Sequence, residues 1–466
     1  MFYEPTKDRS PLTPELSRLG LICVIFFTVS GGAYGLEPLV GSLNPGWAVM
    51  LIILTPLFWC LPIAWMVSEL SGALPLEGGY YIWVREGLGD FWGFQEGWWT
   101  LCYTVIDMAI YPVLFVDYLA YFYPWLSLSA AQGPSSWRIY LSRWLIALAV
   151  IATGFVANWR GIRIVGRSST LTLVLVLSPF ALLVLLGLHH WGMVQAAFQH
   201  IKTGLAQKHQ GHLLALGVAT VLWNYSGWDN ISTFAAEVKQ AGRNYPFALA
   251  VAQGLILAAY VLPVVAGIGA STSPAIWSES AGWPAIARLM AGNWLAIAVA
   301  TMGVVSAWSM FNSQLLYVSR IPYAMACDGW LPSPLMRISK ATGVPINALA
   351  LACIVSGMVA ALPFTKLVVI DILLYSAELF LEFLALMALR IKKPEMERPF
   401  RVPGGWPGLI FVTISPMALA LVVAAASMRG ARADLYQMVI VPVVVASGII
   451  VYFCRRNAFR YKEQLR

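Results

Sequence analysis

The sequence predicts an all-α integral membrane protein of about twelve spanning helices. The predicted architecture is a 5+5 inverted repeat in which helices 1 and 6 are broken, followed by two C-terminal helices. Composition is the first indication: 59% of the 466 residues are hydrophobic and only 11% are charged, whereas a soluble protein carries roughly 25% charged residues. The second is a series of long apolar runs. The third is a pair of glycine-rich interruptions five spans apart.

Each predicted span is a mainly apolar run near the ~20 residues that a helix needs to cross the hydrocarbon core. Abundant Trp and Tyr suit the two headgroup regions that border such a core. The twelve runs are residues 19–43, 47–73, 92–123, 139–157, 163–187, 212–237, 246–271, 292–318, 346–363, 367–391, 406–428 and 435–454.

The basic residues predict the orientation of these spans. An even number of spans puts both termini on one side, and that side receives 22 of the Lys and Arg residues against 8 on the other. Positively charged loops stay in the cytoplasm, so we expect a multi-pass protein of the plasma (inner) membrane with both termini cytoplasmic. The basic residues lie in short loops and form no single stripe, so we expect no nucleic-acid partner.

Two spans carry polar interruptions. The first contains Ser30, Gly31, Gly32, Tyr34, Gly35 and, just after them, Glu37. The sixth contains Trp223, Asn224, Tyr225, Gly227 and Asp229. Glycine weakens a helix, and the backbone groups it frees inside a membrane must line a cavity or bind something. Broken helices at matching repeat positions indicate a transporter binding site near the bilayer midplane, so we expect these residues to bind substrate.

Acidic residues inside the spans are the second sign of a site, since each is costly in a membrane and usually functional. Asp107 lies near the middle of the third span, and Glu378 and Glu382 share a face of the tenth. Glu69, Asp117 and Asp371 also lie in spans. We expect no Lys or Arg deep enough to neutralise these acids, which implies protonation or a cationic guest. Glu37, Asp229, Glu378 and Glu382 are the candidates for proton coupling or gating.

The predicted spans define the domain organisation. Residues 1–18 form a cytoplasmic tail, and 19–391 form a transport core of two halves, 19–187 and 212–391. Residues 406–454 form two accessory helices, and 455–466 form a second tail. We expect residues 188–211 to be an external loop holding the histidines. The five histidines leave a metal site in this loop as an alternative, but we expect an ordinary interfacial loop. We expect no cofactor and no metal site, because the scattered cysteines show no CxxC or zinc-ligand spacing.

Several motifs resemble the amino acid–polyamine–organocation transporter superfamily, particularly its plant and protozoan polyamine uptake branch. They are Glu69 to Val84, Phe91 to Gly97, Ile106-Asp107, Tyr111 to Leu119, Trp223-Asn224, Trp228-Asp229, Glu237-Val238 with Arg243 and Pro246, Asp328 to Pro332, Leu381 to Phe383, and Ile391 to Pro403. The resemblance covers almost the whole chain. It implies the LeuT-like five-plus-five fold and secondary transport by alternating access.

The resemblance also implies roles for individual residues. In related arginine/agmatine exchangers, an Asn that contacts the cationic end of the substrate matches Asp107, and a Trp that closes over substrate matches Trp223. A Glu after the second break matches Asp229. Two positions depart from the relatives: a Lys found on helix 5 of some of them falls near Val176, and a helix 8 Trp of the exchangers falls at Gln314.

Two functions remain open at the level of the sequence. The first is proton-coupled uptake of a polyamine or another cationic, amine-bearing substrate. The second is a general amino acid permease or exchanger for neutral amino acids, whose glycine breaks hold the α-amino and α-carboxylate groups. A channel or sensor is a remote alternative. We expect no enzyme, because the chain shows no nucleophile paired with a base and no phosphate-binding loop. The expected partners are the lipid bilayer, a small-molecule substrate and a coupling proton.

Overall fold

A computed structural model gives the protein's fold. It describes residues 18–464 except 77, 128–135, 161, 207–210, 239, 278–281, 340–341, 363 and 430–434. Helices make up nearly all of this part of the chain. It contains no β-strand, only an isolated antiparallel bridge between Ile338 and Pro345.

The main helices follow one another in the order α1 (Arg18–Val29), α2 (Glu37–Ser42), α3 (Pro45–Thr55), α4 (Leu61–Ala73), α5 (Gly79–Leu88), α6 (Asp90–Leu119), α7 (Ser136–Trp159), α8 (Ile162–His189), α9 (Trp191–Leu205), α10 (Gly211–Asn224), α11 (Ala241–Ala270), α12 (Pro274–Trp277), α13 (Trp283–Ala291), α14 (Asn293–Val318), α15 (Arg320–Cys327), α16 (Ile346–Val359), α17 (Phe364–Lys392), α18 (Gly405–Arg429) and α19 (Leu435–Gln464). Short helical turns lie at η1 (Pro56–Cys60), η2 (Pro124–Leu126), η4 (Asn230–Glu237) and η5 (Ser333–Met336).

The all-helical membrane class predicted from composition is confirmed. Every predicted apolar run coincides with a helix or a pair of helices. Within the described residues, 7 helical segments are long and apolar enough to cross a membrane. The helices Arg18–Val29 and Ile346–Val359 are apolar but shorter. The number twelve and the inverted repeat therefore stay predictions.

The second span shows how local sequence sets helix geometry. Asn44 caps α3, because its side-chain oxygen accepts from the Trp47 amide at 3.2 Å and Pro45 needs no amide partner in the first turn. Pro56 and Pro62 lie farther along the same span, and their missing N–H groups interrupt the α-helical ladder. The chain bridges this region with the π-helical turn η1 before α4 continues.

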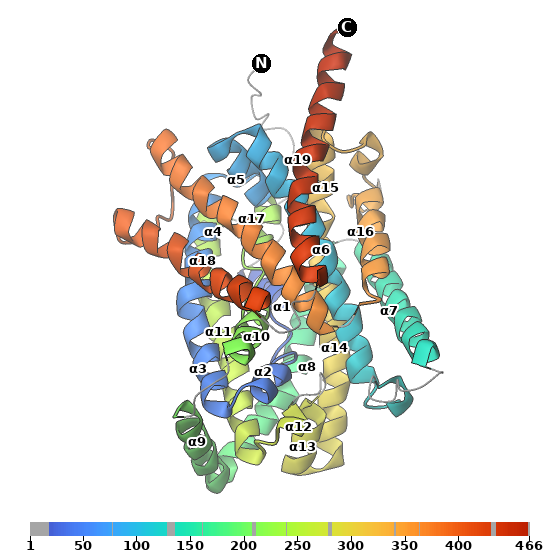
Figure 1. Ribbon diagram of the computed structural model, residues 1–466, viewed down its shortest axis with the longest axis vertical. Coiled ribbons are helices and arrows are strands. Elements are labelled where there is room, and N and C mark those ends of the chain that lie inside the picture. The colour runs from blue at the N-terminus through green and yellow to red at the C-terminus, as the bar shows by residue number, and fades with distance from the viewer. Residues whose placement is uncertain are drawn as a thin grey trace.

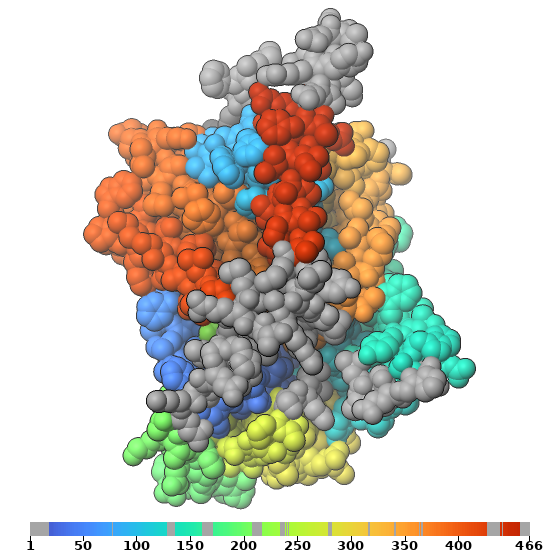
Figure 2. All heavy atoms as spheres, in the orientation of Figure 1, coloured from blue at the N-terminus to red at the C-terminus, as the bar shows by residue number. Residues whose placement is uncertain are grey.

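The helices divide the molecule into two ends (Figure 1). One end, at the top of the view, holds α5, α15 and the end of α19, and the other holds α9, α12 and α13. The start of α1 lies beside the start of α11, since the Arg18 guanidinium donates to Asn244 at 2.6 Å. Figure 2 shows one face of the molecule, where α5, α17, α18 and α19 form the upper surface and α9 and α13 lie at the lower end.

Residues 188–211 differ from the predicted external loop. Most of them form helix α9, which packs against α3 and α11. The contact is close because Gly46 and Gly204 face each other, and the Asn44 side-chain amide donates to the Gly204 carbonyl at 2.8 Å. Of the five histidines, His209 lies outside the described residues, and nothing is described of the His212 side chain. The apolar residues of α9 recur with helical spacing and form one apolar face, and this was the sequence signal that was overlooked.

One short helical hairpin occurs twice. Gly89 is the single residue between α5 and α6, and Gly292 is the single residue between α13 and α14. Both glycines have positive φ angles, of 97° and 80°. Each donates its amide at 2.9 Å to the carbonyl of an arginine four residues earlier, Arg85 or Arg288. The first hairpin lies at one end of the molecule and the second at the other (Figure 1).

The two interrupted helices lie in the centre. α1 packs against α8, α11 and α14, and α10 packs against α2, α3, α17 and α18. Each interrupted helix therefore contacts helices from the other half of the chain. The long helix α6 packs along both α14 and α17 and borders the same central region.

Candidate functional site

The first helix break is a real interruption of the backbone. α1 ends at Val29, and residues 30–36 are irregular before α2 begins at Glu37. Gly32 and Gly35 adopt φ angles of 89° and 87°, which side-chain-bearing residues rarely adopt. The freed carbonyls find partners on α13 and α14. The Ser306 hydroxyl donates to the Gly31 carbonyl at 2.5 Å, and the Trp283 indole donates to the Ala33 carbonyl at 2.8 Å.

Glu37 is fully buried at the start of α2 and is held in place by two donors. The Gly35 amide donates to one carboxylate oxygen at 2.7 Å, and the Tyr118 hydroxyl donates to the other. A negative charge at this place also meets the positive end of a helix, although α2 is short. Within the described residues, no Lys or Arg forms an ion pair with Glu37.

The second break repeats this arrangement. α10 ends at Asn224, and the chain resumes helical turns in η4 at Asn230. Gly227 has a φ of 93°, and a Cβ at this position would lie 3.0 Å from the Thr28 carbonyl oxygen at the end of α1. Only glycine allows the two breaks to approach this closely. The predicted interruptions at Gly31 to Gly35 and at Gly227 are thus both present, and they lie against each other.

Asp229 is fully buried just after the second break. The Tyr375 hydroxyl, from α17, donates to one carboxylate oxygen of Asp229 and also accepts the Gly227 amide at 3.2 Å. The other oxygen of Asp229 has no hydrogen-bond partner. The site therefore keeps an unsatisfied carboxylate oxygen in its buried interior, which is costly unless a cation or proton occupies it.

Asn224 and Trp223 join the two breaks. The Asn224 side-chain amide donates to the Gly35 carbonyl at 3.3 Å, and the Tyr260 hydroxyl donates to the Asn224 carbonyl at 2.6 Å. A Cβ at Gly35 would lie 2.9 Å from the Trp223 ring, so the indole fits only because residue 35 is glycine. The Trp223 ring also contacts Phe364 with a centroid separation of 5.3 Å.

Asp107 lies beside this junction, in the middle of α6, and is only 6% exposed. The Tyr111 hydroxyl donates to it at 2.9 Å and the Tyr317 hydroxyl at 3.5 Å. Gln314 connects the two tyrosines: its amide donates to Tyr111, and its oxygen shares the single Tyr317 hydroxyl proton with Asp107. The Tyr111 ring lies 6.3 Å from Trp223, which places this carboxylate next to the second break. Within the described chain, Asp107 has no ion-pair partner.

Two of the expected unpaired acids are in fact paired, so the expectation was wrong for them. Glu69 accepts from Arg390 at 2.5 and 2.8 Å and pairs with Arg398 at 3.2 Å. Asp117 pairs with Arg143, which also donates to the Leu126 carbonyl at 2.8 Å. The partners lie far away in sequence or beyond a loop, so the position of the acids along their own spans did not reveal them.

Tyr34 and Tyr225 take packed positions. The Tyr34 hydroxyl donates to the Val299 carbonyl at 2.8 Å and that of Tyr225 to the Ile52 carbonyl at 3.1 Å. Val176, near which the resemblance places the lysine of some relatives, is fully buried and would lie 3.5 Å from a Cβ on Gly32. An apolar side chain therefore occupies the place beside the first break where a lysine would put a charge.

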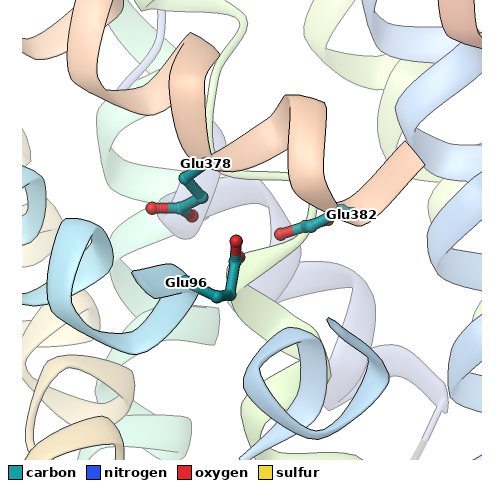
Figure 3. A group of neighbouring side chains, drawn as sticks. All are labelled: Glu96, Glu378 and Glu382. Carbon is teal, nitrogen blue, oxygen red and sulfur yellow. The ribbon is translucent and has the colours of Figure 1, made fainter. Parts of the chain in front are cut away.

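Glu378 and Glu382 lie apart from the breaks, with a third carboxylate that the sequence did not single out. The side chain of Glu96, from α6, points toward both of them on α17 (Figure 3). Ligand oxygens of the three lie within 4.8 Å of one another, and all three residues are fully buried. A signal for Glu96 existed: it is eleven residues before Asp107, close to three helical turns, so both lie on one face of α6.

The aromatic partners of the carboxylates were also missed. Tyr111, Tyr118, Tyr317 and Tyr375 each donate to a buried acid. Only Tyr111 had a local signal, since it follows Asp107 by one helical turn. The others come from different helices, so only the tertiary packing brings them to the acids.

Broken helices that meet in a membrane interior, with buried carboxylates between them, define a membrane transport protein. The sequence matches the amino acid permease family over residues 16–449. The chain therefore belongs to the amino acid permease family, whose class is transport and not enzymatic catalysis.

Individual relatives agree with this class. A probable polyamine transporter of Arabidopsis thaliana is 33% identical over 421 residues, which are 88% of this chain and 82% of that protein. The polyamine transporter PUT1 of Oryza sativa subsp. japonica is 33% identical over 419 residues, which are 88% of this chain and 74% of that protein. An uncharacterized transporter of Mycobacterium tuberculosis is 27% identical over 368 residues, or 77% of each chain.

Proposed function

We propose that this protein is a proton-coupled secondary transporter that takes up a polyamine or a similar cationic, amine-bearing substrate. The observation that carries the proposal is Asp107, a buried carboxylate beside the junction of the two helix breaks that has no basic partner within the described residues. A carboxylate in this setting favours a cationic guest, because an uncompensated buried charge is costly. The names of the plant relatives support an amine substrate.

The substrate ammonium group, in this proposal, contacts Asp107 and the carbonyls around Gly31 and Asn224. Tyr111 and Tyr317 hold the carboxylate of Asp107 in position. Trp223 lies between Tyr111 and Phe364 and closes one side of the site. Its aromatic face also suits a cation, which the ring quadrupole attracts.

The second candidate is a general amino acid permease, and the family's description favours it. Such a substrate needs free amides at the first break for its α-carboxylate. Two of these amides already have partners within the chain, because Gly35 donates to Glu37 and Gly32 donates to the Ser30 hydroxyl at 3.1 Å. An amine without a carboxylate fits this arrangement better.

Coupling requires a carboxylate that can gain and lose a proton during the cycle. Asp229 is our first candidate, because one of its oxygens is unpartnered and the other is bound by Tyr375, which also accepts the Gly227 amide. A proton on Asp229 changes its hydrogen bond with Tyr375. This change shifts the second break from one conformation toward another. Glu37, Glu378 and Glu382 are the remaining candidates.

The proposed architecture is two inverted five-helix repeats, residues 19–187 and 212–391, with accessory helices over 406–454 and cytoplasmic tails at 1–18 and 455–466. The repeated hairpin supports it, since α5–Gly89–α6 and α13–Gly292–α14 share their turn geometry and lie at opposite ends of the molecule. Alternating access then follows from movement of one part of the repeats against the other around the central site.

The test is uptake into liposomes containing the purified protein. Labelled putrescine, arginine and leucine are compared with and without an inward proton gradient. We expect gradient-driven accumulation of putrescine and weak competition by leucine. Accumulation of leucine that ignores the gradient would support the permease and contradict the amine symporter.

A further inference from the structure

A second group of buried carboxylates lies on the same face of α6 as Asp107. Glu96 is eleven residues before Asp107, which is about 16 Å along the helix axis. It faces Glu378 and Glu382 of α17 (Figure 3). The distance separates this group, which we call the glutamate triad, from the Asp107 site.

The triad lacks any partner that would neutralise it. None of its six carboxylate oxygens has a hydrogen-bond partner, and no ion pair to it occurs in the described chain. The hydroxyl of Thr100, near Glu378, donates instead to the Glu96 backbone carbonyl at 2.7 Å. Three carboxylates so close together repel one another, so bound protons or a positively charged guest are favoured there.

A fourth buried acid also has one unpartnered carboxylate oxygen. Asp229, which follows the second helix break, interacts electrostatically with all three glutamates. It is fully buried, and its second carboxylate oxygen is unpartnered. The unsatisfied acceptors therefore extend from the triad to the break where substrate is proposed to bind.

Three buried tyrosines of α5, α6 and α17 do not supply the missing donors. Tyr80, Tyr103 and Tyr375 all interact electrostatically with glutamates of the triad. The hydroxyls of Tyr80 and Tyr103 donate to Asn230, and that of Tyr375 donates to Asp229. Their rings nevertheless provide aromatic surface of the kind that attracts alkylammonium groups.

The geometry points to a second ammonium-binding site: we infer that the glutamate triad binds a primary ammonium group of the substrate. This inference rests on the proposed function and extends it. A primary ammonium has three N–H donors, one for each carboxylate. At N–O distances of about 2.8 Å, its tetrahedral donors place the acceptors about 4.6 Å apart. The triad oxygens, all within 4.8 Å of one another, are close enough for one ammonium group to reach all three carboxylates.

The charge of the triad allows an ammonium group and protons to bind at the same time, as coupling requires. One ammonium balances one of three carboxylates, and the other two can hold protons while still accepting hydrogen bonds through their carbonyl oxygens. Amine and protons can therefore occupy the triad together, as uptake of both in one direction requires. Glu96 lies nearer than Asp107 to the start of α6, which follows α5. The triad is therefore a separate binding site on the path of the amine.

The number of bound diamines tests the inference. A four-carbon diamine spans about 6 Å between its nitrogens, given about 3.6 Å for every three backbone bonds, so one molecule does not reach from Asp107 to the triad. Equilibrium dialysis of labelled putrescine against the purified full-length protein is expected to give two bound molecules. Glu96→Gln and Glu378→Gln each weaken one of the two sites about tenfold to a hundredfold, the loss of one charged hydrogen bond.

Two further variants separate this inference from the proposed function. Glu86→Gln removes a surface carboxylate outside the triad, and both sites are expected to remain. Asp107→Asn is expected to abolish transport and the other binding site while the triad keeps its putrescine. If the protein transports leucine and not putrescine while two putrescine sites remain intact, the proposed function is contradicted. The ammonium site at the triad is then not contradicted.

Several outcomes would overturn the inference. One is a single putrescine bound to the wild type. Another is two sites of unchanged affinity in both Gln variants. A third is Mn²⁺ or Ca²⁺ that binds at the triad, is lost in Glu378→Gln and is not displaced by putrescine, which would make the triad a metal site. Gln variants that fail to elute as single species are replaced by Glu382→Gln, which removes one charge from the same triad.

Discussion

At the scale of single residues, the buried carboxylates fall into two groups with different roles. Glu69 and Asp117 have arginine partners and stabilise the structure. Asp107 and Asp229 have no ion-pair partner among the described residues, so their charge is available to a guest. The difference follows from tertiary contacts, because Glu69 pairs with Arg390, which lies 321 residues later in the sequence.

Glu69→Gln is expected to destabilise the protein by about 3–5 kcal/mol, because it leaves two arginines beside a neutral partner in a buried place. Glu86→Gln is the matched control, since Glu86 pairs with Lys393 at 2.6 Å on the surface, where an ion pair contributes about 0–1 kcal/mol. Thermal unfolding of both purified variants in detergent gives the comparison. Equal melting temperatures would contradict a structural role for Glu69.

Tyr375→Phe removes the hydroxyl that links Gly227 to Asp229. We expect a loss of about 1–3 kcal/mol, since a buried amide and a buried carboxylate each lose a partner, together with slower putrescine uptake. Tyr140→Phe, at a residue that is 53% exposed, is the control and leaves both unchanged. Normal uptake by Tyr375→Phe would remove this tyrosine from the coupling mechanism.

At the scale of elements, the helix breaks depend on glycines with positive φ angles. Their position could be predicted, because Gly31 to Gly35 and Gly227 interrupt otherwise apolar runs. Their contacts could not, since Asn224 reaches Gly35 only through the packing of α10 against α2. Helix α9 was missed for a related reason. Its residues are too polar for a membrane span, and the role of its apolar face is seen only when that face packs against α3 and α11.

Gly35→Ala is expected to abolish transport. The new methyl group would lie 2.9 Å from Trp223 at a backbone φ of 87°, which costs roughly 1–3 kcal/mol before any clash is counted. Gly254→Ala provides a matched control inside α11, because a Cβ there has no neighbour within 4 Å. The control should retain transport and gain about 0.5–1 kcal/mol of stability. Full activity of Gly35→Ala would show that the first break is not part of the site.

At the scale of the whole molecule, the sequence was sufficient for the membrane class, and the orientation stays a prediction. Composition and apolar run length depend on the bilayer as solvent and not on tertiary contacts. The glutamate triad shows the limit of this reasoning. Glu378 and Glu382 share a helical face that the sequence displays, but Glu96 joins them only because α6 packs along α17.

The proposed orientation predicts the behaviour of reporter fusions. With α19 ending on the cytoplasmic side, green fluorescent protein fused to the C-terminus should fluoresce in bacterial cells, and alkaline phosphatase fused there should be inactive. Active phosphatase at this position would reverse the proposed topology.

The most direct measurement of the central claim is putrescine uptake by Asp107→Asn protein in liposomes under an inward proton gradient. Asn keeps the size of the side chain and removes its charge, so a lost ammonium contact is the main change. We predict a decrease of at least about tenfold in uptake, from one lost charged hydrogen bond, with Glu86→Gln as the active control. Uptake by Asp107→Asn equal to that of the control would contradict the placement of the substrate amine at Asp107.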